Sequence, residues 1–398
     1  MTAVGRENRH TMRPHRRIGW IVALILIQAA GSAAGASLVR QETVEFGPTP
    51  QTRTDVYPLA ASPDAPADAR PGFLLATDLR RGGGSAVVRL PDGSREAEGT
   101  FGEGVGRFAR VLSPADGDGA GELEVSTELA TGSYRLYLVD APPPEAYWPL
   151  AAHGGVIFAI GLVVLVAMSL RRPIPVAWVA VGVCVWVAGV VLHWVWTSRV
   201  DPLLFPWLAD RLAPTSAAAV RAVYMGIVAA VFQLGAMAAL LPLLPACENP
   251  AARAKALAAG FVGAAFLFAG IDLVADSAFI MKEGAGSDQA AVEVAIEFAR
   301  TPGYLLANIL GRVSVLATVY ACVVLLQRGR NGRFRLAALA FILYAAHALL
   351  RALPEAFGDP LPQSAWWAAT PLLIVMLPIA IYVYRRTAGA DADVEASS

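Results

Sequence analysis

Hydrophobic residues in this chain collect in long runs separated by short polar segments. Each run is about twenty residues long, and a helix of that length crosses the hydrocarbon core of a bilayer. The first run is Ile18–Leu38. Seven more follow at Trp148–Leu170, Ile174–Thr197, Ala218–Ala246, Ala256–Met281, Gly303–Gln327, Leu336–Leu353 and Ala365–Tyr384. The pattern predicts an α-helical polytopic membrane protein, with a seven-helix bundle over residues 148–386 and a short cytoplasmic tail over 387–398.

Residues 1–38 combine a basic tail with the first apolar run. Ala34, Gly35 and Ala36 supply the small residues of a signal-peptidase site, so the segment is typical of a secretory signal peptide. If it is not cleaved, the same segment forms a signal-anchor helix. Both interpretations export the region that follows.

The region 39–147 has a different pattern, in which apolar and polar residues alternate with the period of a β-strand. Alternating stretches occur at Phe73–Leu79, Ser85–Leu90, Glu122–Thr127 and Ser133–Val139, with turns at Pro91–Ser94 and Asp116–Gly121 and a loop at Ala60–Arg70. Several short strands predict a small exported all-β domain that is β-sandwich-like. The cysteines lie outside this region, so the domain would fold without disulfides.

Composition and charge agree with a membrane location. Charged residues make up 16% of the chain, whereas soluble proteins have about 25%. Basic residues recur in the N-terminal tail and in every second loop, at Arg171–Arg172, Arg253–Lys255, Arg328–Arg335 and Arg385–Arg386. The positive-inside rule places these loops in the cytoplasm and the β domain outside a bacterial inner membrane. We expect the lipid bilayer and a protein as partners, and no nucleic acid.

Polar side chains inside the apolar runs form a layer near the outer ends of the predicted helices. At a rise of 1.5 Å per residue, most of them lie roughly 6–13 Å below the outer boundary. Ionisable groups in hydrocarbon usually face a bundle interior or a water-filled cavity. We therefore predict an outward-open, ligand-binding cup formed by His153, His193, Asp272, Asp276, Asn308, Arg312, His347 and Arg351.

The chemistry of this layer is open to four interpretations. The polar groups could lock the bundle, with Asp272 paired to Arg312, or they could bind a ligand. His153, His193 and His347 could hold zinc with one position left open for catalysis. His153 and His193 could instead be the axial ligands of haem b. The sequence contains no motif that identifies catalytic residues.

Two outer segments are predicted to lie against the membrane surface. Asp201–Pro214 is short and aromatic, and reads as a loop. Asp288–Arg300 is amphipathic, with Glu293 and Glu297 on one face, and could cap the bundle.

An exported β domain followed by seven helices resembles the layout of bacterial seven-helix receptors with an extracellular sensing module. The resemblance is one of architecture and implies ligand sensing. The chain departs from that layout because the tail after Arg386 is too short for an output domain. We therefore expect ligand or partner binding, or sensing, without an output domain of its own. The alternatives are a membrane-embedded zinc hydrolase acting at the outer leaflet and an accessory subunit of an envelope complex.

Overall fold

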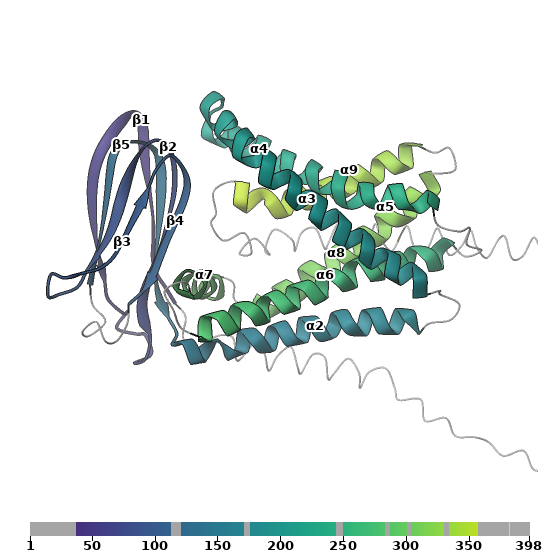
Figure 1. Ribbon diagram of the computed structural model, residues 1–398, viewed down its shortest axis with the longest axis horizontal. Coiled ribbons are helices and arrows are strands. Elements are labelled where there is room, and N and C mark those ends of the chain that lie inside the picture. The colour runs from purple at the N-terminus through teal and green to yellow at the C-terminus, as the bar shows by residue number, and fades with distance from the viewer. Residues whose placement is uncertain are drawn as a thin grey trace, which may run out of the picture.

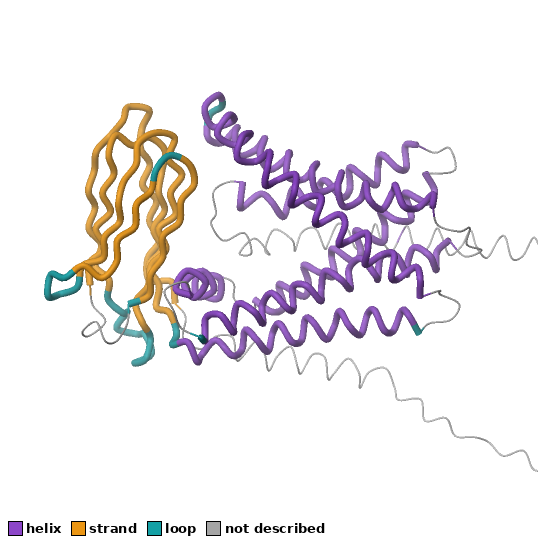
Figure 2. The backbone as a smooth tube through the Cα atoms, in the orientation of Figure 1, coloured by secondary structure: helices purple, strands orange, loops and turns teal. Residues whose placement is uncertain are grey.

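A β-sheet domain stands at one end of a bundle of long helices (Figure 1). The computed structural model describes residues 37–112, 121–170, 176–243, 250–282, 287–300, 304–329, 334–356 and 382. Within these residues the strands come first in the chain and the helices follow (Figure 2).

Five strands form one antiparallel sheet: β1 (Ser37–Leu59), β2 (Arg70–Arg89), β3 (Arg95–Phe101), β4 (Gly104–Val111) and β5 (Gly121–Ala141). The three long strands lie in the order β1-β5-β2, and the other edge of β2 is shared by two short strands. β4 pairs with residues 72–79 of β2, and β3 pairs with residues 84–89. The predicted turn at Pro91–Ser94 closes the β2–β3 hairpin, where Ser94 donates its backbone N–H to Asp92 Oδ1 at 2.8 Å.

The long strands bend over at one end of the domain (Figure 1). The β1–β5 register shifts between Phe46 and Gln51, and the β2–β5 register shifts after Leu79. The backbone needs glycine at this level, because Gly82 and Gly132 have φ values of 82° and 119°. The bend brings the two halves of the sheet face to face around a shared apolar core.

A β-sheet domain is present as predicted, and its four alternating stretches lie within strands except for Leu90, which follows the end of β2. β1 was not predicted, because most of its residues are exposed and its alternation is weak. Ser37 and Leu38 belong to β1, so the predicted first apolar run extends too far. The predicted turn at Asp116–Gly121 lies outside the described residues, except for Gly121.

The helices largely follow the apolar runs. They are α2 (Trp148–Ser169), α3 (Val176–Arg211), α4 (Pro214–Ala229), α5 (Gly235–Leu240), α6 (Pro250–Met281), α7 (Ser287–Arg300), α8 (Tyr304–Gly329) and α9 (Phe334–Ala356). A π-helix, η3 (Ala230–Leu234), joins α4 to α5. In the described part of the chain, five helical spans are long and apolar enough to cross a membrane, and α8 has a shorter apolar stretch. The predicted runs at the two ends of the chain lie outside the described residues, apart from residues 37, 38 and 382.

One predicted loop is wrong, because residues 201–211 continue α3 as a helix. The helix has 36 residues and is about 54 Å long, well beyond the roughly 30 Å of a bilayer core. Pro202 and Pro206 each remove a helical hydrogen bond without ending the helix. Contacts with α4 hold the extension, since Tyr224 donates its hydroxyl to Asp201 at 2.8 Å.

Glycines set the close packing of α2 and α3 on α6. A Cβ on Gly154 would lie 2.6 Å from the Gly270 carbonyl oxygen, and one on Gly161 would lie 3.0 Å from the Gly263 carbonyl oxygen. The two pairs are two helical turns apart on both helices, as an antiparallel contact requires. Small residues let membrane helices approach closely enough for backbone contact. α6 therefore forms the centre of this part of the bundle.

Candidate functional site

Helix α7 lies between the sheet and the bundle, and Figure 1 shows it nearly end-on in that position. Val292, Ala295 and Ile296 on its apolar face are fully buried. They belong to one hydrophobic core that also contains residues of the sheet, of the short helix η2 (Pro144–Tyr147) and of α6, including Leu74, Val111, Tyr137, Val139, Tyr147, Leu273 and Ile280. This amphipathic segment is helical as predicted, but its apolar face packs in this shared core. Sheet and bundle therefore form one packed unit.

The polar face of α7 is bound to strand β4. Arg110 donates to Asp288 at 2.8 Å, and Arg107 donates to Glu293 at 3.2 Å. On the bundle side, the Tyr147 hydroxyl donates to the Ala291 carbonyl oxygen at 3.0 Å. The helix is thus joined to both of its neighbours by hydrogen bonds as well as by apolar contacts. We call α7 with these contacts the α7 joint.

The alternation of β2 explains how the sheet meets the joint. Phe73 and Leu75 belong to the inner core of the folded sheet, whereas Leu74 belongs to the core that includes α7. A Cβ on Gly72 would lie 3.2 Å from Val292 Cγ2. Both faces of β2 are covered at this level, so Phe73, Leu74 and Leu75 are all apolar at the start of the stretch that was predicted to alternate.

Asp288 is a titratable group in the first turn of α7, at the joint. Burial raises its pKa above the ordinary value of an aspartate, although the charge of Arg110 and hydrogen bonds from Val111 and Arg110 act in the opposite direction. Desolvation therefore outweighs pairing at this carboxylate. The joint contains a group that binds a proton more readily in the folded protein than in the unfolded chain.

A second polar cluster lies inside the bundle, around His347 on α9. Tyr344 donates its hydroxyl to Gln233 of the π-helix. His347 Nε2 lies 3.4 Å from Ser314 Oγ on α8, and Thr318 donates to the Ser314 carbonyl oxygen at 2.8 Å. The cluster thus connects α8, α9 and the π-helix, and π-helices often occur at functional sites.

The three predicted histidines lie on helices with different neighbours. His153 is buried on α2, which packs on α6, whereas His347 is buried on α9, which packs on α4 and α8. His193 is half-buried on α3. Among the described residues, no group of three or more His, Cys, Asp or Glu side chains is placed to hold a metal ion. The zinc and haem assignments gain no support and stay predictions.

The expected Asp272–Arg312 pair is not formed. Asp272 is exposed and makes no ion pair with any described residue. Arg312 instead donates to the Ala265 carbonyl oxygen at 3.4 Å, and its guanidinium lies 5.8 Å from the centre of the Phe266 ring. At the helical rise per residue, Ala265 lies about 10 Å from Asp272 along α6. The Arg312 guanidinium is therefore too far along the helix axis to pair with Asp272.

The remaining predicted site residues are spread over three helices. Asp276 is half-buried near the end of α6. Asn308 lies in α8, but its side chain is outside the described part of the structure, and Arg351 lies one turn beyond His347 on α9. The structure supports a polar cluster at His347, and it leaves a single cup formed by all eight residues as a prediction.

An aromatic cluster between α3 and α4 was missed. The Trp196 indole N–H donates to the Tyr224 hydroxyl at 3.0 Å, and the Arg221 guanidinium lies 4.0 Å from the centre of the Phe205 ring. Asp201 and Phe205 are four residues apart, and this spacing would have placed them on one face of a helix. The interpretation of residues 201–214 as a loop hid that signal.

No known protein family, curated protein or solved structure matches this chain.

Proposed function

We propose that this chain is a multi-pass protein of a bacterial inner membrane that binds a ligand or partner with its exported domain and passes the bound state to the bundle. The α7 joint is the observation that carries the proposal. We take the folded sheet to be a β-sandwich-like binding module. A protein partner would respond to the state of the bundle.

The packing at the joint favours transmission over simple tethering. Domains joined by a small polar interface normally move relative to each other, whereas a large apolar interface restrains them. Here the sheet residues Leu74 and Val139 share a core with Val292 of α7 and Leu273 of α6. A displacement of strand β4 would therefore be felt by α7 and by the end of α6.

Helix α6 is well placed to receive such a displacement. In the most apolar stretch of α6, 61% of the residues are buried, against 17–33% in the corresponding stretches of the other four apolar spans. It packs on α2, α3 and α8, and Ser277 near its end donates to the Tyr147 carbonyl oxygen at 2.9 Å. A movement at its sheet-facing end would reach most of the bundle through these contacts.

Hydrogen exchange of the full chain in nanodiscs tests the proposal. Val292→Asp places a carboxylate in the shared core, so we expect faster amide exchange in β4 and in the last turns of α6. Leu129→Asp adds the same carboxylate at an exposed position of β5, away from the α7 joint, and is the control. Equal exchange in both variants would contradict transmission through α7.

Reporter fusions test the orientation of the chain in the membrane. Alkaline phosphatase fused after Asp140 should be active, because that residue lies in the exported domain, and a fusion after Arg386 should be inactive. An active fusion after Arg386 would contradict the proposed topology.

A further inference from the structure

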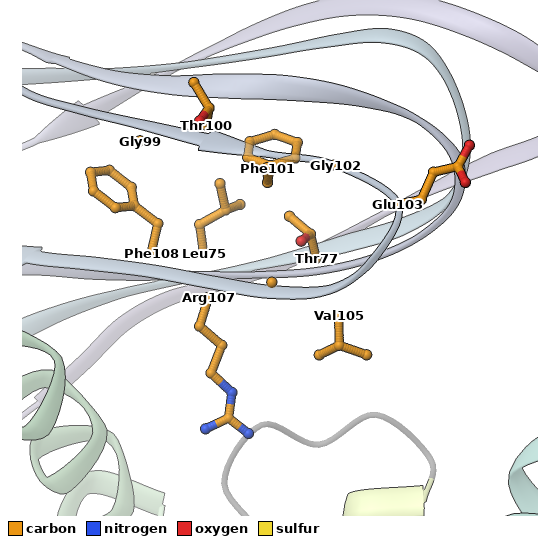
Figure 3. A pocket seen from close by; sticks show the side chains of 11 residues that line it. Leu75, Thr77, Gly99, Thr100, Phe101, Gly102, Glu103, Val105, Arg107 and Phe108 are labelled. Atoms are coloured by element: carbon orange, nitrogen blue, oxygen red, sulfur yellow. The ribbon is translucent and has the colours of Figure 1, made fainter. Parts of the chain in front are cut away.

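A cavity of about 270 Å³ lies inside the β domain, between β3 and the paired strands β2 and β4 (Figure 3). Leu75, Phe101 and Phe108 supply its apolar lining. Figure 3 shows Thr100 and Phe101 on one side, with Leu75, Thr77 and Phe108 rising from the other. Gly102, Glu103 and Val105 also line the cavity and are exposed to solvent, so they form its mouth.

Thr77 gives this cavity its polar feature. The residue is 3% exposed, and its Oγ1 has no hydrogen-bond partner among the described residues. Gly106 lies opposite on β4, where a Cβ would be 2.7 Å from that oxygen. Glycine therefore keeps the space beside the hydroxyl open. A buried hydroxyl without a partner is costly, which favours a ligand group that bonds to it.

We propose that the cavity binds a small neutral molecule with a compact aromatic or aliphatic body and one hydroxyl or carbonyl group. Its volume is below the 300–1,000 Å³ typical of sites for drug-sized ligands, so it suits a single ring or a short chain. The nearest cation, Arg107, points away from the cavity in Figure 3 and is paired with Glu293. The buried lining offers no charge to offset that of an ionic ligand.

Strand β4 connects this cavity to the α7 joint. In the β2–β4 ladder, Gly106 and Phe108 stand opposite Thr77 and Leu75 and line the cavity. Arg107 lies between them in the sequence and bonds to Glu293 of α7. A ligand that displaces Phe108 would therefore displace Arg107 as well. This part of the inference rests on the proposed function, because it assigns the ligand class of the same binding domain.

Fluorine NMR on the full chain in nanodiscs tests the site, with 4-fluorophenol as the probe and 4-fluorotoluene as its analogue without a hydroxyl. Empty nanodiscs measure partition into lipid. We expect saturable binding of 4-fluorophenol, weakened about two- to tenfold by Thr77→Val, which is the contribution of one hydrogen bond. The same variant should leave 4-fluorotoluene unchanged. Thr43→Val, at an exposed position of β1, is the matched control.

Gly102→Leu provides a second variant, because a Cβ at Gly102 meets nothing within 4 Å and the longer side chain would cover the mouth. It should weaken both probes. Binding no greater than to empty nanodiscs, or an equal loss of both probes in Thr77→Val, would overturn the site. Saturable binding that leaves the hydrogen exchange of α7 unchanged would establish the site and contradict its coupling to the bundle.

Discussion

Arg110 and Asp288 are 178 residues apart in the chain, yet Arg110 Nη1 lies 2.8 Å from the Asp288 carboxylate. The pair joins the end of strand β4 to the first turn of α7. An acidic side chain at this end also interacts favourably with the helix dipole.

The raised pKa of Asp288 predicts the sign of a pH effect on stability. Between the ordinary aspartate pKa of about 3.9 and the raised value, the folded protein binds more protons than the unfolded chain. Stability should therefore fall as the pH rises through this window and level off above it. The difference in unfolding free energy between the wild type and Asp288→Asn, measured from pH 3 to pH 7, should show this slope.

Asp92→Asn is the control with the opposite sign. Hydrogen bonds from Ser94 lower the pKa of Asp92, so its contribution is present above the ordinary pKa and is lost as the pH falls. If both variants give the same sign, the account of Asp288 is wrong.

The two halves of the folded sheet are joined by consecutive hydrogen bonds from Tyr57 to Tyr134 and from Tyr134 to Asp55. Tyr134 donates to Asp55 at 2.6 Å, and its oxygen lies 2.8 Å from the buried Tyr57 hydroxyl, which therefore acts as the donor to Tyr134. Tyr134→Phe should cost about 1–3 kcal/mol of unfolding free energy, because it leaves the Tyr57 hydroxyl buried without a partner. Tyr57→Phe should cost less, since Tyr134 keeps its bond to Asp55. Denaturant titration of the single and double variants measures these unfolding free energies. A larger loss of stability for Tyr57→Phe than for Tyr134→Phe would contradict this order of donors.

Gly154 and Gly155 on α2 give a matched test of helix packing. A methyl group on Gly154 would contact the backbone of α6, whereas one on Gly155 meets nothing within 4 Å. Gly154→Ala should destabilise the bundle by about 1–3 kcal/mol, the usual cost of overpacking. Gly155→Ala should be neutral or slightly stabilising, because alanine favours a helix. Thermal unfolding in nanodiscs separates these results, and equal melting temperatures would argue against the α2–α6 contact.

The hydrogen bond between Gln233 and Tyr344 should be measurable as a coupling energy. Hydrogen bonds between membrane helices contribute about 0.6 kcal/mol on average and up to about 1.7. A double-mutant cycle of Gln233→Leu and Tyr344→Phe should give a coupling in this range. Strict additivity would show that the π-helix is not held to α9 by this bond.

The periodicity of the sequence was sufficient to predict the β domain, most of the helices and the amphipathic character of α7. It could not identify the surface that α7 meets, because an apolar face is suited equally to lipid and to a sheet. The segment 201–214 was predicted to be a loop, whereas contacts with α4 compensate for the hydrogen bonds that Pro202 and Pro206 remove and residues 201–211 continue α3.

The candidate site shows a similar limit. The depth of His153, His193 and His347 follows from counting residues, but the neighbours of each helix do not. The glycine contacts that place α2 on α6 depend on backbone approach between segments more than 100 residues apart. Asp272 and Arg312 have opposite charges and lie on helices that pack together. They do not pair, because the position of the Arg312 side chain along the helix axis brings it to Ala265 instead. Likewise, Thr77 is one of several polar residues in β2, and its position opposite Gly106 inside the fold, which leaves its hydroxyl buried beside open space, cannot be read from the sequence.

Spin-label distance measurements across the α7 joint test the central claim most directly. With the native cysteines replaced, labels at Val56 of β1 and Phe334 at the start of α9 would occupy exposed positions of the two parts. We predict one narrow distance distribution in nanodiscs, broadened by Val292→Asp and unchanged by Leu129→Asp at an exposed position of β5. A broad distribution in the unaltered protein, or one that Val292→Asp leaves narrow, would contradict the account.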